Sequence, residues 1–265
     1  MTAPTIPRSH PRYRSLMVRS DLAEKMAEGL VVPEGLMAHG RGEAFDYLLG
    51  EKTTPEAAKA ERAAAAHLLL ARHPVLSVNG NVAALAAAEV ASLSKSLPRL
   101  TVEVNLFHRT PDRARRVADA LRQAGVPTVL GEHPTARLRG LASDRAWVDA
   151  HGILRADVVV VPLEDGDRAE ALVRAGKFVI SVDLNPLSRT SQKAQLPIVD
   201  ELTRALRHID LGILRMRRWE PSRISTVAQS VEAPEVLSSA LRRIRVRLDR
   251  LAAPEPRRGA PRRAG

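Results

Sequence analysis

Short apolar runs alternate with longer helix-forming segments along most of the chain. The runs PVLSV, ADVVVVPL and KFVISVDL are almost continuously apolar, as in strands that are buried on both faces. Strand and helix patterns alternate, and this predicts an α/β fold with a doubly wound, mostly parallel sheet. The expected strands are 74–78, 100–108, 126–132, 156–163, 177–184 and 196–200; the expected helices are 55–73, 82–97, 110–125 and 164–176.

The N-terminal part has a different pattern. Three prolines close to the start predict an extended arm over residues 1–14. Ser20-Asp21 predicts the cap of a helix that ends near Gly29. The sheet is therefore expected to follow an N-terminal helical segment.

The run AHGRGEAFDYLLGE, residues 38–51, has two interpretations, a catalytic loop and an ordinary capped helix. Gly40 and Gly42 would let the backbone come close to a phosphate, and Arg41 would supply charge. From Glu43 onward the residues favour a helix. We expect a nucleotide-binding loop in the first half of the run and a helix in the second.

Composition excludes several classes of protein. The chain has no cysteine, which rules out disulfides, thiolate metal sites and a cysteine nucleophile. The first residues lack the apolar core of a signal peptide, and the longest apolar run is far too short to span a bilayer. We expect a soluble, cytoplasmic protein that does not use a membrane.

The positive charge is concentrated near the C-terminus. Residues 204–265 carry 15 arginines and 6 carboxylates, a net +9, so residues 1–203 carry only +2 of the total of +11. Such a region could bind polyanions, which leaves a nucleic-acid-binding protein as the alternative function. The other interpretation is a solvated arginine-rich helical region over 207–251 with a disordered basic tail over 252–265.

Polar residues follow four of the expected strands. In parallel doubly wound sheets, ligands bind beyond the carboxyl ends of the strands. Asparagine, aspartate and glycine are also the commonest turn and cap residues, so a purely structural role remains open for each segment. The segments are Asn79-Gly80-Asn81, 105–109, 164–168 and 183–185.

Common catalytic motifs are missing from the sequence. Neither G-x-x-x-x-G-K-[ST] nor a G-x-G-x-x-G after a strand occurs, which disfavours a P-loop hydrolase and an ordinary dehydrogenase. No serine has a G-x-S-x-G setting. Because the histidines lack ligand spacing, we expect no dedicated metal site. Asp165 and Asp167 could help to hold a magnesium ion that is bound to a nucleotide.

The chemistry that remains combines arginines, carboxylates and amides. This set suits the binding of polyanionic substrates and the transfer of a phosphoryl or nucleotidyl group, in which the protein positions and neutralises charge. A single arginine is more often a solvated surface group, so a surface position without a functional role is the alternative for each of these residues. The candidates are Arg19, Arg41, Arg109, Arg168 and Arg189.

Several long motifs of the chain resemble those of one known family, and they occur in the same order. IPRSHPRYRSL, GLMAHGRGEAFDYLLGEKTTPEA, HPVLSVNGNVAAL, VEVNLFHRT, ADVVVVPLEDGDRAEALVRAGKFVISVDLNPLSRT and IVDELTRA are similar to segments of archaeal phosphopantothenate synthetase, a 4-phosphopantoate-beta-alanine ligase. The resemblance runs from about residue 6 to 206. It implies a Rossmann-like ligase domain over 15–206 and a homodimer.

The resemblance also implies a reaction. 4-Phosphopantoate and beta-alanine would be joined to 4'-phosphopantothenate in coenzyme A biosynthesis, with ATP cleaved to AMP and pyrophosphate through a phosphopantoyl adenylate. ATP would act as a substrate with Mg²⁺, and no permanent cofactor is expected. Two phosphorylated substrates must approach each other, which explains a need for many cations and amides.

Site residues follow from the matching motifs and from the strand ends. The family's ATP-binding positions fall on Arg19, Arg41, Asp183, Leu184, Asn185, Ser188, Arg189, Asp200 and Glu201. Arg41, His39, Asp165 and Arg189 are the expected catalytic residues. We expect Asn79, Asn81, Asn105 and Arg109 to bind phosphopantoate, because they offer amide and cationic donors at neighbouring strand ends.

Overall fold

The computed structural model describes residues 6–10 and 12–253 and is built around one parallel sheet. Its six strands have the order β3-β2-β1-β6-β7-β8, and every neighbouring pair is parallel. The predicted α/β fold with a doubly wound sheet is confirmed. The strands are β1 (Pro74–Val78), β2 (Thr101–Val104), β3 (Val129–Leu130), β6 (Val158–Pro162), β7 (Phe178–Val182) and β8 (Leu196–Ile198).

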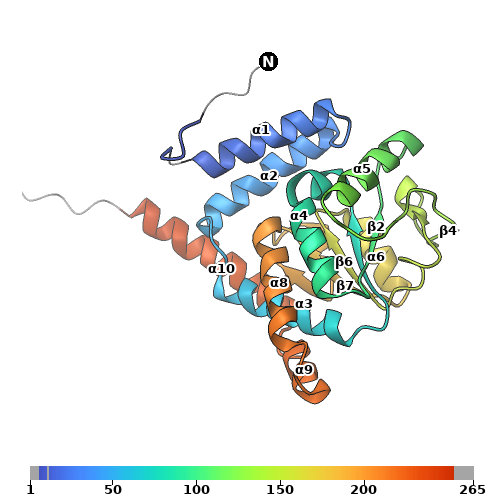
Figure 1. Cartoon of the computed structure of the whole chain (residues 1–265). Helices are drawn as coiled ribbons and strands as arrows, with labels where there is room; N and C mark the ends of the chain where they lie inside the picture. Colours follow the sequence, from blue (N-terminus) through green and yellow to red (C-terminus); the bar gives the residue numbers. More distant parts are fainter. Residues whose placement is uncertain (1–5, 11, 254–265) are drawn as a thin grey trace, which may run out of the picture.

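The strand order reverses between β1 and β6. β2 and β3 are added on one side of β1, whereas β7 and β8 are added on the far side of β6, so the boundary is a topological switch point. Helices surround the sheet (Figure 1). They are α1 (Tyr13–Ala27), α2 (Pro33–Leu49), α3 (Pro55–Leu70), α4 (Gly80–Ser96), α5 (Pro111–Gln123), α6 (Gly166–Arg174), α7 (Arg189–Lys193), α8 (Leu202–Met216), α9 (Pro221–Ala228) and α10 (Ala233–Ala252).

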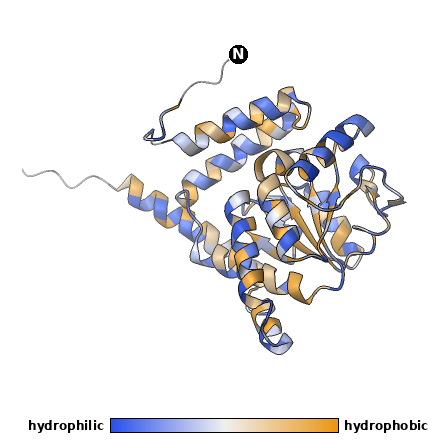
Figure 2. Ribbon diagram, in the orientation of Figure 1, coloured by the Kyte–Doolittle hydropathy of each residue, from blue (hydrophilic) through white to orange (hydrophobic). Residues whose placement is uncertain are grey.

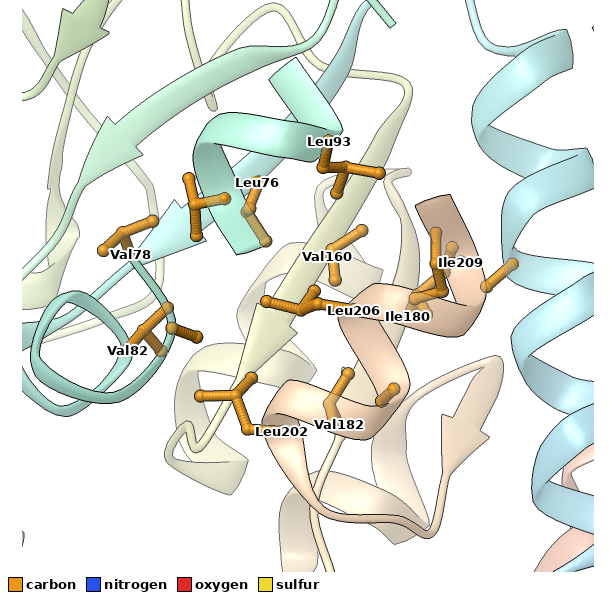
Figure 3. Close-up of a cluster of buried hydrophobic side chains, with 14 of the residues drawn as sticks. Leu76, Val78, Val82, Leu93, Val160, Ile180, Val182, Leu202, Leu206 and Ile209 are labelled. Carbon is orange, nitrogen blue, oxygen red and sulfur yellow. The ribbon is translucent and has the colours of Figure 1, made fainter. Parts of the chain in front are cut away.

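Alternate strand residues enter two different cores. Leu76 and Val160 belong to a large cluster with α3, α4, α5 and α8, whereas Val75 and Val159 belong to a smaller cluster with α6. Figure 3 shows the large cluster, in which Leu206 of α8 lies among the strand side chains. Because side chains alternate across a strand, the same run packs against helices on both faces, which explains its continuous apolar character.

The expected loop at the start of AHGRGEAFDYLLGE is wrong. α2 is helical from Pro33 to Leu49, so Gly40 and Gly42 lie inside a helix. Pro33 at the first helical position starts the helix earlier than the glycines suggest, and packing against α1, α4 and α10 outweighs the cost of about 1 kcal/mol for each glycine. The helix ends at Gly50 with φ +97°, as expected for the second half of the run.

The first helix also starts earlier than predicted. α1 begins at Tyr13, so Ser20 lies in its interior and is not a cap. Its end is as expected, because the chain turns at Gly29 with φ +79°. Part of the predicted arm over 1–14 is therefore helical, and residues 1–5 and 11 lie outside the described residues.

The C-terminal region forms three helices that pack on the body of the protein. The predicted boundary at 206 lies inside α8, whose buried face packs on α3 and α4. Arg204, Arg207 and Arg243 each pair with a carboxylate of another element. For these arginines the contacts favour the structural interpretation over polyanion binding. α10 reaches Ala252, and residues 254–265 of the predicted tail lie outside the described residues.

A small irregular unit was not predicted. Between β3 and β6 the chain forms the antiparallel pair β4 (Ala136–Arg137) and β5 (Trp147–Val148), with a short 3-10 helix, η1 (Asp144–Ala146), directly before β5. Its strands have only two residues each, too few for a periodic pattern. The unit carries Arg145 to the carboxyl edge of the sheet.

Hydropathy follows the layers. The central strands are mostly hydrophobic, whereas the outer helices mix hydrophilic and hydrophobic residues (Figure 2). Within residues 6–10 and 12–253, none of the helices combines the length and the apolar character needed to cross a bilayer.

Candidate active site

A cavity of about 510 Å³ lies at the carboxyl edge of the sheet, over the switch point between β1 and β6. Its walls come from the segments after β1, β2, β6 and β7 and from one side of α2. Eight of the expected catalytic, ATP-binding and substrate-binding residues line it: Arg41, Asn79, Asn81, Asp165, Asp183, Asn185, Ser188 and Arg189. The fold therefore gathers polar residues that are distant in the sequence.

The two asparagines after β1 organise one wall of the cavity. Asn79 Oδ1 accepts a hydrogen bond from the Val82 backbone N–H at 3.1 Å and caps α4, while Nδ2 donates to the Leu163 carbonyl at 2.9 Å. Leu163 has φ +50°, an uncommon value for leucine, and this amide bond helps to hold it. Asn81 Nδ2 donates to the Gly35 carbonyl at 2.8 Å and fixes the start of α2.

The loop after β7 forms the opposite wall. The Asp183 carboxylate accepts a hydrogen bond from the Asn185 N–H at 2.9 Å, and Ser188 caps α7 by accepting from the Ser191 N–H at 3.1 Å. Burial raises the pKa of Asp183, while Ser188, the Asn185 N–H and the charge of Arg41 act in the opposite direction. A nearby cation would therefore strongly favour the ionised form of the Asp183 carboxylate.

A network of ion pairs lies at the cavity floor. Glu164 pairs with both Arg145 and Arg168, and Asp165 pairs with Arg145 at 3.1 Å. Arg168 is fully buried and also donates to Ser77 Oγ at 3.0 Å. Burial raises the pKa of Asp165, and Arg145 opposes this shift. Arg168 does not line the cavity, so its contacts give it a structural role, while Asp165 lies at the surface of the cavity.

Two arginines and a histidine at the cavity were not named as site residues by the sequence analysis. Arg113, Arg145 and His108 line the wall next to β2. Arg113 lies in α5, whose many charges are typical of a solvated helix, and Arg145 lies in the irregular unit between β3 and β6. His108 lies within the polar segment after β2, which was the only signal available.

Asn105 and Arg109 do not line the cavity. Asn105 is buried, and its Nδ2 donates to the carbonyls of Arg145 at 3.2 Å and Trp147 at 2.9 Å. Arg109 Nη2 donates to the carbonyls of Gly131 and Glu132 at 2.7 and 2.8 Å, and burial lowers the pKa of Arg109. Asn105 holds the segment that carries Arg145, and Arg109 holds the turn after β3.

Other predicted residues form a second group outside the cavity. Arg19 of α1 pairs with Glu43 of α2 at 2.7 Å. His39 lies on the same side of α2 as Glu43. Burial lowers the pKa of His39, and the charges of Glu43 and Glu201 oppose this shift only in part. Glu201 caps α8 by accepting from the Thr203 and Arg204 N–H groups at 2.9 and 3.0 Å. Leu184 is buried and does not line the cavity either.

A polar cluster also lies where α3, α8 and the end of β8 meet. Glu61, Asp200 and His208 offer ligand atoms within 4.8 Å of one another, a grouping that the histidine spacing does not reveal. Burial, with a contribution from a hydrogen bond to Asp200, raises the pKa of Glu61 to about 9. Glu61 Oε2 lies 2.7 Å from His208 Nδ1. The Asp200 carboxylate accepts hydrogen bonds from Arg204 Nη2 at 2.7 Å and from Thr53 Oγ1 at 2.5 Å.

The sequence of this chain is similar to those of one known family. The family model described as phosphopantothenate/pantothenate synthetase matches residues 56–247. The chain belongs to this family. A relative from Thermococcus kodakarensis, named 4-phosphopantoate-beta-alanine ligase, is 50% identical over 93% of this chain and 95% of its own length. A Methanosarcina mazei relative of the same name is 48% identical over 94% of this chain and 97% of its own.

The family match covers the whole sheet. In this member of the phosphopantothenate/pantothenate synthetase family, residues 56–247 include all six parallel strands and every wall of the cavity apart from α2. The matches to the two relatives are longer and cover 93% and 94% of the chain. The residues that remain uncovered are too few to include both N-terminal helices. The cavity is therefore built within the part of the chain that these relatives share.

Proposed function

We propose that this protein is an ATP-dependent ligase that joins 4-phosphopantoate and beta-alanine into 4'-phosphopantothenate and releases AMP and pyrophosphate. One observation carries the proposal: the cavity at the switch point gathers Arg41, Asp183, Asn185, Ser188 and Arg189, all expected to bind ATP, opposite the polar end of β1. Family membership supplies the substrate class.

The reaction has two balanced steps. A carboxylate oxygen of phosphopantoate attacks the α-phosphorus of ATP, the bond to the bridging oxygen breaks, and pyrophosphate leaves. The beta-alanine amine then attacks the acyl carbon of the adenylate, loses a proton and forms the amide, while AMP leaves with the electron pair of the broken acyl-oxygen bond. The protein mainly orients the reactants and neutralises charge during the first step.

Arg41 and Arg189 are the cations assigned to the ATP phosphates. Arg41 reaches the cavity from α2, and Arg189 reaches it from the start of α7. Arg189 pairs at 2.7 Å with Asp167, but both side chains are more than half exposed, so this pair is weak and a phosphate could replace it. Arg19, Asp200 and Glu201 lie outside the cavity and are assigned to the outer end of the nucleotide site. His39, which lies close enough to Glu43 and Glu201 for their charges to affect its pKa, is assigned a catalytic role.

Asp165 fits a contact to the magnesium ion that ATP carries. It lines the cavity at the start of α6, and its side chain is 52% exposed. Its Oδ2 pairs with Arg145, which leaves Oδ1 to face an ion. Mg²⁺ prefers oxygen ligands and takes few from the protein when it binds a nucleotide, so one carboxylate suffices. The ion would neutralise phosphate charge.

A homodimer is part of the proposal. α10 exposes Leu241, Leu248 and Leu251, which lie at spacings of seven and three residues and therefore on one side of the helix. A helix side that is apolar and exposed fits an interface with a second copy of the chain.

A direct assay tests the ligase proposal. Purified protein with ATP, Mg²⁺, 4-phosphopantoate and beta-alanine is expected to form AMP and phosphopantothenate in equal amounts. Without beta-alanine, labelled pyrophosphate should still exchange into ATP, because the adenylate step is reversible. Formation of ADP would overturn the adenylate route, and the absence of any product would overturn the ligase.

A further inference from the structure

A polar cluster outside the cavity combines one histidine and two carboxylates. Glu61 comes from α3, Asp200 follows β8, and His208 comes from α8. None of the three lines the cavity. One ligand atom of each residue lies within 4.8 Å of those of the other two. Ligand atoms around a tetrahedral zinc ion are about 3.4 Å apart, so small side-chain rotations would bring all three to coordination distance.

Glu61 is almost completely buried, yet one of its oxygens meets no donor. Its side chain is 1% exposed, and Oε2 lies 2.7 Å from His208 Nδ1. Within residues 6–10 and 12–253, Oε1 has no hydrogen-bond partner. The carboxylate also lies within hydrogen-bonding range of the Asp200 carboxylate. Two buried carboxylates that face each other in this way need a proton or a cation between them.

One fixed cation serves three largely buried carboxylates around this cluster. Arg204 pairs with Asp46 at 2.6 Å and with Asp200 at 2.7 Å. Among the ion pairs of the described residues, Glu61 meets only His208, and Asp200 meets only Arg204. Arg204 balances one of the three negative charges, and two remain when Glu61 is ionised. A divalent ion would balance both.

The ligand types select a class of metal ion. Imidazole together with carboxylate suits divalent transition metals such as Zn²⁺, whereas Mg²⁺ and Ca²⁺ prefer oxygen ligands alone. Asp200 Oδ2 accepts one hydrogen bond, from Thr53 Oγ1 at 2.5 Å, and keeps a lone pair for an ion. The His208 side chain is 42% exposed, so an ion can enter from solvent beside it and keep one water. Three protein ligands and a water complete a tetrahedral zinc site.

We propose that Glu61, Asp200 and His208 bind a divalent transition-metal ion, with Zn²⁺ as the best fit, that joins α3 and α8 to the end of β8. The ligands come from three separate elements, so the spacing of histidines in the sequence could not reveal them. This ion is distinct from the magnesium of ATP, which is assigned to Asp165 inside the cavity. Its role is structural, and the inference does not depend on the proposed ligase function.

A proton takes the place of the ion in the metal-free protein. Burial, with a contribution from Asp200, raises the pKa of Glu61 to about 9. Metal ligands must be deprotonated before they bind, so zinc would displace this proton. Any pH dependence of stability that comes from Glu61 is therefore expected after treatment with a chelator.

The first experiment measures zinc binding by the purified full chain. Protein treated with a chelator is titrated with Zn²⁺ alone, in competition with a fluorescent zinc indicator. We expect one ion per chain in the wild type and an affinity at least about tenfold lower in His208→Gln, because losing groups that merely orient metal ligands already costs about 10- to 100-fold. The matched control is His133→Gln, which changes a histidine that is 88% exposed and should bind zinc as the wild type does.

Thermal unfolding and X-ray absorption test where the ion lies. Excess Zn²⁺ is expected to raise the Tm of the wild type and of His133→Gln by about 5 °C and to leave the Tm of His208→Gln unchanged. The zinc-edge spectrum of the wild type should show an imidazole nitrogen and carboxylate oxygens at about 2.0 to 2.2 Å. A spectrum with oxygen ligands alone would overturn the inference.

Three results of the titration would also overturn it. The wild type could bind no zinc after chelation. Equal affinities of the wild type and His208→Gln would mean that zinc binds adventitiously to other histidines. Binding that requires ATP would assign the ion to the nucleotide. A wild type that binds zinc at this cluster but forms no phosphopantothenate would refute the ligase proposal and leave the metal site intact.

A second variant guards against misfolding. His208→Cys removes the imidazole but supplies a thiolate, which is a strong zinc ligand, and the chain has no other cysteine. It should regain zinc affinity relative to His208→Gln and add one sulfur ligand at about 2.3 Å to the zinc-edge spectrum. A folded His208→Cys protein that binds zinc no better than His208→Gln, without a sulfur ligand, would place the ion elsewhere and reject the site.

Discussion

The Asp46 carboxylate in α2 accepts two hydrogen bonds from the Arg204 guanidinium in α8, at 2.6 and 3.1 Å. The same guanidinium contacts Asp200 at 2.7 Å, which ties α2 to the end of β8. Burial alone would lower the pKa of Arg204, but its bonds to Asp46 and Asp200 raise it above the usual value. This link fixes the helix that carries Arg41 over the cavity.

Replacing Asp46→Asn should weaken that link. Asp46 and Arg204 are only 14% and 17% exposed, so the loss of one charge is expected to lower the free energy of unfolding by about 1 to 3 kcal/mol. Urea unfolding measures the change. Asp119→Asn is the control, because its pair with Arg122 is largely exposed and should cost about 0 to 1 kcal/mol. Equal effects of the two substitutions would contradict a special role for Asp46.

Arg41→Ala should affect activity and leave stability nearly unchanged. Arg41 is exposed at the cavity, and none of the ion pairs among the described residues includes it. We expect kcat/KM for ATP to fall at least about tenfold, while the free energy of unfolding changes by less than about 0.5 kcal/mol. The control is Arg62→Ala, on the exposed side of α3. Strong destabilisation by Arg41→Ala would return this arginine to a structural role.

The sheet could be predicted because its strands carry their signal locally. Each apolar run specifies its own strand, and the polar residues that follow lie at one edge by topology alone. α2 could not be predicted in full, because Gly40 and Gly42 disfavour a helix and only tertiary packing compensates. Sequence patterns describe local preference, so elements held by long-range contacts are the ones they miss.

The same reasoning explains which site residues were found. Asn79 and Asp183 follow strands, so topology places them at the cavity. Arg145 does not follow a long strand. Its position at the cavity depends on the hydrogen bonds from Asn105 that hold the irregular unit. The sequence placed Asn105 close to the site but could not show that its amide supports a neighbouring arginine.

Glu61→Gln should remove a pH dependence of stability. The pKa of Glu61 is raised to about 9 in the folded protein, far above that of an exposed glutamate, with Asp200, Arg204 and His208 around it. The folded state therefore holds a proton that the unfolded state releases, and stability falls as pH rises from about 4.5 toward 9. Glutamine resembles the neutral acid and does not titrate.

Unfolding between pH 6 and 9 checks this prediction. The wild type is expected to lose stability relative to Glu61→Gln, with a slope of up to about 1.4 kcal/mol for each pH unit. Glu51→Gln, at an exposed position in the turn after α2, is the control and should follow the wild type. A constant difference between wild type and Glu61→Gln across this range would show that Glu61 is already ionised in the folded protein.

Leu248→Glu should dissociate the proposed homodimer. Leu248 is 46% exposed on α10, between Leu241 and Leu251, and a carboxylate in the middle of an apolar interface would be desolvated. Sedimentation equilibrium is expected to show a dimer for the wild type and a monomer for Leu248→Glu. The control is Leu211→Glu, which changes a similarly apolar residue that is 61% exposed on α8. If Leu211→Glu gives the monomer and Leu248→Glu remains dimeric, the interface lies on α8 instead of α10.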